Sequence, residues 1–361
     1  MTLRAIMTVL VTGAAGFIGA HVVQQLLSEG RSVRATVRNP ENARFLNAFS
    51  KSKGASLEIV KMDLLELESV VKAVHGCRVV IHCAAALMVG VKNPLVEVVN
   101  PSVIGTENLC TAIEKAESVQ TIIHTSSVAA IRSTRYQNGH IFSSSDWCDD
   151  VNPDMNPYGF AKAEAERIMR AFVDKCDEHS KPRLVTIHPS IVFGPVFHKR
   201  HTRGSMAYLK HFTGRLPFVL HTHLNYVDVR DVAKAHIAAI NSGPDGARHI
   251  LHKEGKWMKD IGSQLRKVLP GKKWAMFRLP SLLAVLMAVF HPKLTVKQVR
   301  SSLGRSVGYN VGNMENELGI QLYASDDTLS DSISSLLELS LIHISEPTRP
   351  RLISYAVFCL K

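Results

Sequence analysis

The first half of the chain alternates short apolar runs rich in Val and Ile with longer segments whose apolar residues recur at helical spacing. Such runs are typical of strands buried on both faces, and their alternation with helices predicts βαβ units around a parallel sheet. The pattern predicts six strands, at 7–11, 33–37, 57–60, 79–83, 121–124 and 184–187. It predicts helices at 18–28, 69–74, 95–115 and 158–175. The expected fold class is α/β, with a doubly wound parallel sheet.

The alternation ends near Pro189, and glycine and proline residues then separate shorter elements. We expect residues 1–189 to form mainly the sheet domain and residues 190–338 mainly a small C-terminal lobe, with late segments returning to the sheet. Ligands of such folds bind beyond the carboxyl ends of the strands, so the lobe is expected to close over a substrate there. One apolar run, at 282–290, is shorter than the about 20 residues that cross a bilayer. It is predicted to pack within the lobe, and contact with a membrane surface is the alternative.

The end of the chain continues neither pattern. Residues 339–349 and 353–360 resemble, in one reading frame, the translation of two blocks of a transposase-type sequencing adapter. We therefore interpret residues 339–361 as an assembly artefact and leave them out of the fold prediction. The tail holds three cationic side chains and one carboxylate, so without it the formal net charge falls from +12 to +10.

The charge remains basic without the tail. Because no aromatic-and-basic nucleic-acid motif accompanies it, a phosphate-bearing cofactor or substrate is the simpler explanation, and nucleic acid is not an expected partner. The cysteines show no C-x-x-C or Cys/His metal spacing, which predicts free thiols and no metal site. The N-terminus lacks the pattern of a signal peptide, so we expect a cytoplasmic protein without a stable membrane span.

A glycine-rich segment follows the first predicted strand and leads into the first predicted helix. Gly13, Gly16 and Gly19 have the spacing G-x-x-G-x-x-G, with one residue more in the first interval than the common dinucleotide fingerprint. The glycines permit a tight turn, and the helix start at Phe17 and Ile18 offers unpaired N–H groups to a pyrophosphate. Because a strand precedes and a helix follows, the segment predicts a dinucleotide site rather than a packing turn.

The end of the second predicted strand distinguishes the two nicotinamide cofactors. An acidic residue there would bind the ribose 2′-hydroxyl of NAD, but the chain has Arg38, which suits the 2′-phosphate of NADP(H). Arg44 is a second candidate, and a solvated surface role is the alternative for both arginines. Asp63 could receive the adenine amino group, with helix capping as the alternative. Further candidates for cofactor contacts are Leu64, Ala84 and Ala85.

A tyrosine and a lysine lie one turn apart at the start of the last predicted helix. Asn156 and Pro157 are typical of an N-cap and a first helical residue, and they place Tyr158 and Lys162 on one face at i and i+4. A phenol has a pKa near 10, and a neighbouring ammonium favours its phenolate form. Lys162 is therefore expected to lower the pKa of Tyr158 while also binding the nicotinamide ribose.

Two serines end the fifth predicted strand, at the same sheet edge as the glycine turn. Ser127 could hydrogen-bond a reacting oxygen and Ser126 could line the cofactor, with strand-end capping as the alternative. The glycine turn, the serines, Tyr158 and Lys162 follow one another in the order expected of a catalytic site, and this order favours a catalytic role over capping. It predicts hydride transfer between NADP(H) and a carbonyl or alcohol, with Tyr158 exchanging the proton.

These motifs resemble those of the extended short-chain dehydrogenase/reductase superfamily, within the NAD-dependent epimerase/dehydratase proteins. The chain is most similar to the dihydroflavonol reductase, cinnamoyl-CoA reductase and aldehyde reductase group, through residues 11–19, 33–38, 124–127, 158–162, 188–195 and 226–233. The resemblance implies a Rossmann fold, a catalytic triad of Ser127, Tyr158 and Lys162, and selection of NADP(H) by Arg38. It also implies further cofactor contacts from Pro189, Val192 and Ser205.

Two departures from that group limit what the resemblance implies about the substrate. Arg132 stands where dihydroflavonol reductases have a flavonoid-recognising Asn, and residues 156–162 differ from the signature of cinnamoyl-CoA reductases. The expected reaction is NADPH-dependent reduction of an aldehyde or ketone by a monomer or homodimer. The alternatives are a 3β-hydroxysteroid (sterol) dehydrogenase-like enzyme using NAD, a nucleotide-sugar epimerase, which Arg38 disfavours, and a non-catalytic NADP sensor, which Tyr158 disfavours.

One basic segment has no role in this scheme. Residues 198–203 read His-Lys-Arg-His-Thr-Arg and have the charge to bind an acidic substrate such as a CoA ester or a phosphate. A solvated mobile loop is the favoured interpretation. His188 and His236 lie in apolar settings and are expected to be satisfied core histidines.

Overall fold

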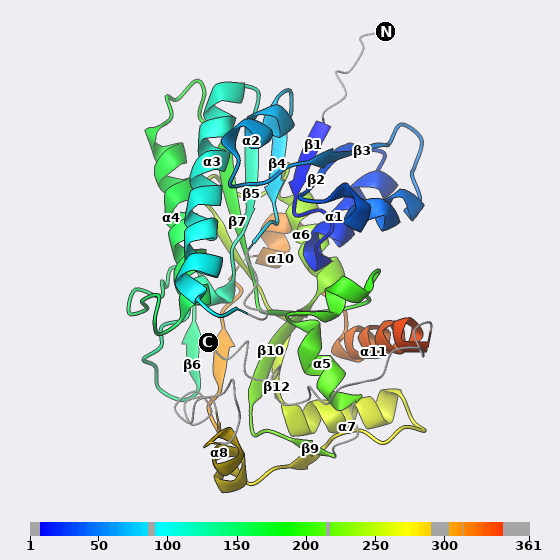
Figure 1. Cartoon of the computed structure of the whole chain (residues 1–361). Coiled ribbons are helices and arrows are strands. Elements are labelled where there is room, and N and C mark those ends of the chain that lie inside the picture. Colours follow the sequence, from blue (N-terminus) through cyan, green and yellow to red (C-terminus); the bar gives the residue numbers. More distant parts are fainter. Residues whose placement is uncertain (1–7, 86–90, 214–216, 290–302, 313, 342–361) are drawn as a thin grey trace.

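A seven-stranded parallel sheet forms the centre of the molecule (Figure 1). The computed structural model describes residues 8–85, 91–213, 217–289, 303–312 and 314–341. The strand order is β11-β7-β5-β4-β1-β2-β3. The strands are β1 (Thr8–Thr12), β2 (Ser32–Val37), β3 (Ser56–Lys61), β4 (Val79–His82), β5 (Thr121–Thr125), β7 (Arg183–Pro189) and β11 (Arg248–Leu251). The predicted doubly wound α/β fold is confirmed.

Helices cover both faces of this sheet because alternate side chains of each strand point to opposite sides. Val9 and Val11 of β1 pack into an apolar cluster with α1 (Phe17–Ser28) and α6 (Val229–Ala238). Leu10, between them, packs into a second cluster on the other face. The helices of that face are α2 (Leu67–Val74), α3 (Asn100–Ala116) and α4 (Pro157–Lys175). Figure 1 shows α3 and α4 side by side.

The apolar pattern placed the strands and helices to within a few residues. All six predicted strands are present, and a late segment returns to the sheet as β11, parallel to β7. The helix predicted at 95–115 consists of a π-helical turn, η2 (Leu95–Val99), followed directly by α3. Pro101 lies in the first turn of α3, directly after the π-helical turn, and because proline has no N–H it cannot donate a backbone hydrogen bond to a carbonyl of that turn.

Segments after Pro189 build a second apolar core below the sheet. Its three-stranded sheet has the order β12-β10-β8, and Phe193, Tyr208, Tyr226 and Ile261 are fully buried in the core. Its elements are β8 (Ile191–Phe193), α5 (Met206–Phe212), β10 (His223–Asp228), β12 (Glu254–Trp257), α7 (Met258–Val268) and α11 (Ser325–Leu341). Because β8 pairs in parallel with β10 two residues after β7 ends, the lobe joins the sheet at the carboxyl end of β7.

Shorter elements complete the described chain. They are η1 (Pro40–Ala48), η3 (Val128–Ala130), β6 (His140–Phe142), η4 (Lys199–Thr202), β9 (Phe218–Val219), β13 (Phe277–Arg278), α8 (Ser281–Val289), β14 (Val307–Tyr309) and α10 (Met314–Leu318). Two pairs, β14 with β6 and β13 with β9, form separate two-stranded sheets.

The structure contradicts the prediction that the apolar run at 282–290 packs within the lobe. Leu282 of α8 is 80% exposed, and Leu283 and Leu286 are also exposed, whereas Ala284 is buried. Periodicity could not reveal this because the run is apolar on every side. Among the helices of the described residues, none has both the length and the apolarity needed to cross a bilayer.

The predicted artefact begins inside α11. Leu339 is partly buried against the second core, and the helix ends at Leu341. Residues 342–361, which carry most of the adapter-like sequence, lie outside the described part of the chain.

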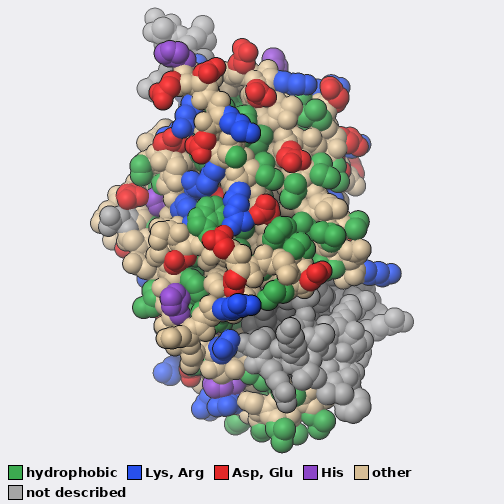
Figure 2. Space-filling model, turned by 90° about the vertical axis from the view of Figure 1, so that its left-hand side faces the viewer, with side chains coloured by type: hydrophobic (Ala, Val, Ile, Leu, Met, Phe, Trp, Pro, Cys, Tyr) green, Lys and Arg blue, Asp and Glu red, His purple; other side chains and the backbone are tan. Residues whose placement is uncertain are grey.

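Cationic and anionic side chains are interspersed on the face formed by α3 and α4. Figure 2 shows Lys and Arg, Asp and Glu, and hydrophobic side chains mixed over this side of the molecule. The basic net charge therefore does not form a continuous positive surface on the face shown.

Candidate active site

The glycine turn brings the start of α1 against the end of β4. Gly13 has φ +63, and a Cβ atom there would lie 2.7 Å from Cα of Ala84. The Gly16 N–H donates to the Gly13 carbonyl at 2.8 Å, and a Cβ atom at Gly19 would collide with that same carbonyl. Side chains at these positions would separate the helix start from the sheet. The turn thus leaves the first N–H groups of α1, at Phe17 and Ile18, close to the strand ends, where an anionic group could accept hydrogen bonds.

A threonine fixes the ends of two neighbouring strands beside the turn. The Thr12 hydroxyl accepts a hydrogen bond from the Ala84 N–H at 3.1 Å and lies 2.8 Å from Nδ1 of His82. Burial, aided by the charge of Lys162, lowers the pKa of His82 to about 3, so this imidazole is neutral at physiological pH. The ends of β1 and β4 are held together by neutral hydrogen bonds, and Ala84 and Ala85 follow at this edge.

The structure brings the predicted lysine to the predicted serines. The Asn156 side chain caps α4 by accepting from the Gly159 N–H at 2.9 Å, which fixes the helix start that carries Tyr158. Lys162, one turn later and only 8% exposed, donates from Nζ to the Thr125 carbonyl at 2.8 Å. Thr125 ends β5 and directly precedes the two serines, so the Tyr158 helix and the serine turn are joined at this bond.

The Ser127 hydroxyl has a partner that leaves its proton available. Ser127 is the N-cap of η3, and its Oγ accepts from the Ala129 N–H at 3.1 Å. A hydroxyl that accepts one hydrogen bond still has its own proton to donate, so Ser127 can donate to a substrate oxygen. Tyr158 is partly buried and packs beside Val98, Val99 and Ala161.

Burial lowers the pKa of Lys162 to about 8, and the nearby groups of Cys83 and Glu166 partly oppose that shift. A lysine with this pKa is mostly an ammonium at neutral pH and loses its charge in mildly alkaline solution. Its positive charge is therefore available to favour the phenolate form of a neighbouring tyrosine, but only up to that pH.

Sequence reasoning missed Glu166, which joins the helix to the serine turn. Its carboxylate is fully buried and accepts from the Ser126 hydroxyl at 2.8 Å and from His188 Nε2 at 2.7 Å. Arg248 Nε and Arg170 Nε also donate to it, at 2.7 and 3.1 Å. Burial alone would raise the pKa of Glu166, but the charges and hydrogen bonds of His188 and Arg248 hold it well below its usual range. The available signal was spacing, because Glu166 lies four residues after Lys162 on the same helix.

The hydrogen bonds of Glu166 bear on the predictions made for Ser126 and His188. The Ser126 hydroxyl donates to Glu166, and the predicted position of Ser126 beside the cofactor stays a prediction. His188 is buried as expected, but only its Nε2 is hydrogen-bonded and its Nδ1 has no partner among the described residues. His236 is satisfied at both nitrogens, by the Thr125 hydroxyl and the Val232 carbonyl.

The residues predicted to contact the adenosine part of NADP(H) lie after β2 and β3. Arg38 is exposed directly after β2, while Arg44 on η1 pairs with Glu41 at 2.6 Å. The Asp63 carboxylate accepts from the Leu65 N–H at 3.0 Å, as in a local turn, and the Leu64 carbonyl accepts from Asn108. Arg38 is thus accessible to an anion, and the cofactor roles of all four residues stay predictions.

The remaining predicted contacts come from the start of the lobe. Pro189 ends β7, Val192 lies in β8 and pairs with Val227 of β10, and Ser205 precedes α5. They lie on the connection from the sheet into the lobe, and their contacts with a cofactor also stay predictions.

The prediction of a solvated mobile loop at 198–203 is wrong for the centre of that segment. His201 in η4 is 2% exposed, and its Nε2 donates to the Ala15 carbonyl within the glycine turn at 3.1 Å. Its ring also lies 5.8 Å from that of Phe17. Lys199, Arg200 and Arg203, by contrast, are exposed. The segment is thus anchored on the glycine turn after β1.

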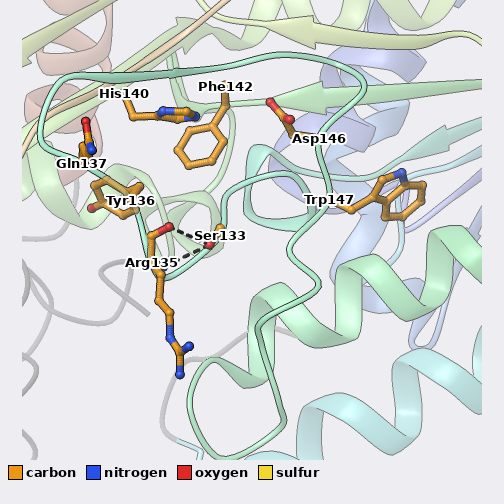
Figure 3. A pocket seen from close by; sticks show the side chains of 8 residues that line it. All are labelled: Ser133, Arg135, Tyr136, Gln137, His140, Phe142, Asp146 and Trp147. Carbon is orange, nitrogen blue, oxygen red and sulfur yellow. Dashed lines mark hydrogen bonds between the residues drawn. The ribbon is translucent and has the colours of Figure 1, made fainter.

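A surface pocket of ≈ 630 Å³ lies on the loop between η3 and α4 (Figure 3). Tyr136 and His140 pack beside Phe142, with ring centroids 5.9 and 4.5 Å from it. The other lining residues are Ser133, Arg135, Gln137, Asp146 and Trp147. Ser127, Tyr158 and Lys162 do not line it. The sequence also predicts that residues 87–89 line the substrate site, and these residues lie outside the described part of the chain.

The fold and the arrangement at the strand ends define a class of protein. A doubly wound parallel sheet with a glycine turn after β1, and a Tyr-Lys helix joined to the serine turn after β5, is typical of a Rossmann-type, extended short-chain dehydrogenase/reductase. The sequence profile of the NAD dependent epimerase/dehydratase family matches residues 9–250, and the chain belongs to that family.

Several proteins with sequences similar to this chain are reductases. Cinnamoyl-CoA reductase CAD2 of Medicago truncatula is 29% identical over 320 residues, which cover 85% of this chain and 92% of the relative. Dihydroflavonol 4-reductase of Zea mays is 30% identical over 270 residues, covering 73% of this chain and 74% of that protein. The structure of yeast methylglyoxal/isovaleraldehyde reductase Gre2 complexed with NADPH is similar with a TM-score of 0.77 at 25% identity, over 92% of this chain and 99% of that one.

Proposed function

We propose that the protein is an NADPH-dependent oxidoreductase that reduces an aldehyde or ketone to an alcohol. The observation that carries the proposal is the bond from Lys162 to the end of β5, because it joins the tyrosine helix to the serine turn beside the glycine cradle. The reductase relatives and the NADPH-bound yeast structure support the same cofactor and reaction type. Arg38, in place of an acidic residue after β2, supports NADP(H) over NAD.

Three side chains would perform the proton chemistry. NADPH, when bound, supplies a hydride to the carbonyl carbon. Ser127 donates a hydrogen bond to the carbonyl oxygen, and Tyr158 transfers its phenolic proton to that oxygen as the alcohol forms. The Lys162 ammonium stabilises the phenolate that Tyr158 becomes, and it would also contact the nicotinamide ribose.

Replacing the proton donor tests this assignment. In Tyr158→Phe, kcat for NADPH-dependent carbonyl reduction should fall about 10²- to 10⁴-fold, because general acid catalysis is lost, while the Kd for NADPH stays unchanged. Tyr323→Phe is the matched control, because it removes a phenolic hydroxyl but keeps the ring that packs on Arg230. If Tyr158→Phe turns over near the wild-type rate, the assignment is wrong. The substrate class would come from a screen of NADPH consumption with aldehydes, aromatic ketones, CoA esters and 3-ketosteroids.

A 3β-hydroxysteroid dehydrogenase-like function with NAD is the second candidate. The observation that favours it is the exposed apolar surface of α8, which would suit an enzyme that collects apolar substrates from a lipid surface. Under this alternative the protein would bind NADH more tightly than NADPH and would oxidise 3β-hydroxysteroids. Coenzyme preference, measured on the same preparation, separates the two candidates.

A further inference from the structure

Arginines from two distant parts of the chain meet beside the glycine turn. Arg38 follows β2, and Arg200 and Arg203 belong to the segment that leads into α5. Arg200 Nη1 donates to the Asn42 carbonyl of η1 at 3.3 Å. Arg38 follows the last residue of β2, and η1 begins two residues later, after its N-cap Asn39. The bond to Asn42 therefore places Arg200 at the carboxyl end of β2, where Arg38 lies.

Two histidines of the segment hold it in this position. His201 donates to the Ala15 carbonyl of the glycine turn, and burial lowers the pKa of His201 to about 3, so the ring stays neutral. The His198 ring stacks on Phe45 of η1, with centroids 5.1 Å apart. The segment is therefore anchored on both the turn and η1, and Arg200 lies between the two anchoring histidines.

Among the described residues, no carboxylate gives these three arginines a counter-charge. Within the described part of the chain, none of them forms an ion pair with a carboxylate, whereas Arg44 on the same η1 is paired with Glu41. Burial and the guanidinium groups of Arg203 and Arg38 lower the pKa of Arg200. Like charges held this close repel one another, so an anion at this place would relieve the repulsion.

We propose that Arg200 and Arg203 join Arg38 in binding the 2′-phosphate of NADP(H). A phosphate monoester carries about two negative charges and three acceptor oxygens, which several guanidinium groups can share. The inference rests on the proposed function, because it concerns the same cofactor. It adds that cofactor selection depends on a segment 160 residues beyond β2, and that the bound phosphate ties the start of the lobe to the sheet domain.

Equilibrium binding of four ligands tests the proposal without any turnover. The Kd values of NADPH, NADH, 2′,5′-ADP and 5′-AMP are measured for wild type, Arg38→Ala, Arg200→Ala, Arg203→Ala and the control Lys210→Ala. Lys210 is an exposed cation of α5, so its variant matches the change in net charge. Because Arg200 and Arg203 are exposed, both variants should melt at the wild-type temperature, and this is checked first.

We expect Arg200→Ala and Arg203→Ala to weaken NADPH and 2′,5′-ADP by roughly tenfold each, the effect of losing one charge-assisted hydrogen bond. NADH and 5′-AMP should change less than about twofold, because they lack the phosphate. Equal weakening of NADPH and NADH, or no weakening of either, would overturn the proposal. If wild type prefers NADH to NADPH, the proposed function fails as well, which the wild-type measurements alone reveal.

Discussion

Glu166 would act at the proposed active site through other residues rather than by touching a substrate. It holds the Ser126 hydroxyl, which precedes Ser127, and its negative charge raises the pKa of Lys162. Both effects come from one carboxylate on the helix that also carries Tyr158. We therefore regard Glu166 as a positioning residue for the proposed reaction.

Glu166→Gln should affect stability and pH dependence together. The change leaves Arg248 and Arg170 facing a neutral amide in a buried site, which should cost about 3–5 kcal/mol of unfolding free energy. Without the carboxylate the pKa of Lys162 falls below about 8, so the ammonium is lost earlier as pH rises. The alkaline decrease in kcat/KM for carbonyl reduction should move to lower pH. Urea unfolding and a pH profile of kcat/KM measure the two effects.

Two further variants separate a positioning role from general damage. Glu164→Gln removes a carboxylate from the same helix, but one that pairs with Arg167 near the surface, so the pH profile should stay in place. Ser126→Ala removes only one hydrogen bond to Glu166 and should leave the protein folded even if Glu166→Gln is not. A pH profile of Glu166→Gln identical to wild type would contradict the assigned effect on Lys162.

At the scale of elements, the glycine turn and α1 depend on close backbone contact. Gly19→Ala would place a Cβ atom against the Gly13 carbonyl and the Ala14 backbone, which cannot move away as a flexible side chain could. The resulting shift should cost about 1–3 kcal/mol of stability and weaken NADPH binding by roughly tenfold or more. Thermal melting and NADPH titration check the result. Ser28→Ala, at the exposed end of the same helix, should bind NADPH like wild type; equal binding by Gly19→Ala would show that the turn can relax.

The sequence predicted elements well where local pattern determines structure. The apolar runs of β1, β2, β4 and β5 are buried on both faces, so their hydrophobic pattern alone located them. Asn156 and Pro157 likewise marked the start of α4, because capping is a local interaction. These two kinds of signal also placed Tyr158, Lys162 and the serines at one sheet edge.

The errors concern residues whose environment is formed by distant segments. His201 is buried because the Ala15 carbonyl, 186 residues earlier, accepts its hydrogen bond, and no pattern near His201 contains that information. Glu166 likewise receives hydrogen bonds from the serine turn after β5, from β7 and from β11, as well as from its own helix. A glutamate on a helix is usually solvated, and a histidine in a segment of Lys and Arg gives no local sign of burial, so both burials could be recognised only after the distant segments were assembled.

At the scale of the whole molecule, two cores meet at the carboxyl ends of the strands. One lies between the sheet and α1 and α6. The other lies in the lobe, around Phe193 and Tyr226. Phe17 packs against both cores. The glycine turn directly before Phe17 contacts η4, because His201 donates to the Ala15 carbonyl. The proposed cofactor site therefore lies where the lobe and the sheet domain join, so ligand contacts from both parts are expected.

The exposed helix α8 gives a prediction about the surface of the lobe. Leu282→Ala should change the unfolding free energy by less than about 0.5 kcal/mol, because the side chain is 80% exposed. Leu265→Ala, in the buried face of α7, should cost about 2–5 kcal/mol and is the matched comparison. Chemical denaturation of dilute protein measures both. A loss at Leu282 as large as that at Leu265 would show that α8 is covered in solution. Sedimentation with phosphatidylcholine vesicles then tests whether α8 binds a lipid surface. If it does, Leu282→Ala lowers the fraction of protein that sediments with the vesicles; if α8 contacts only water, neither protein sediments with them.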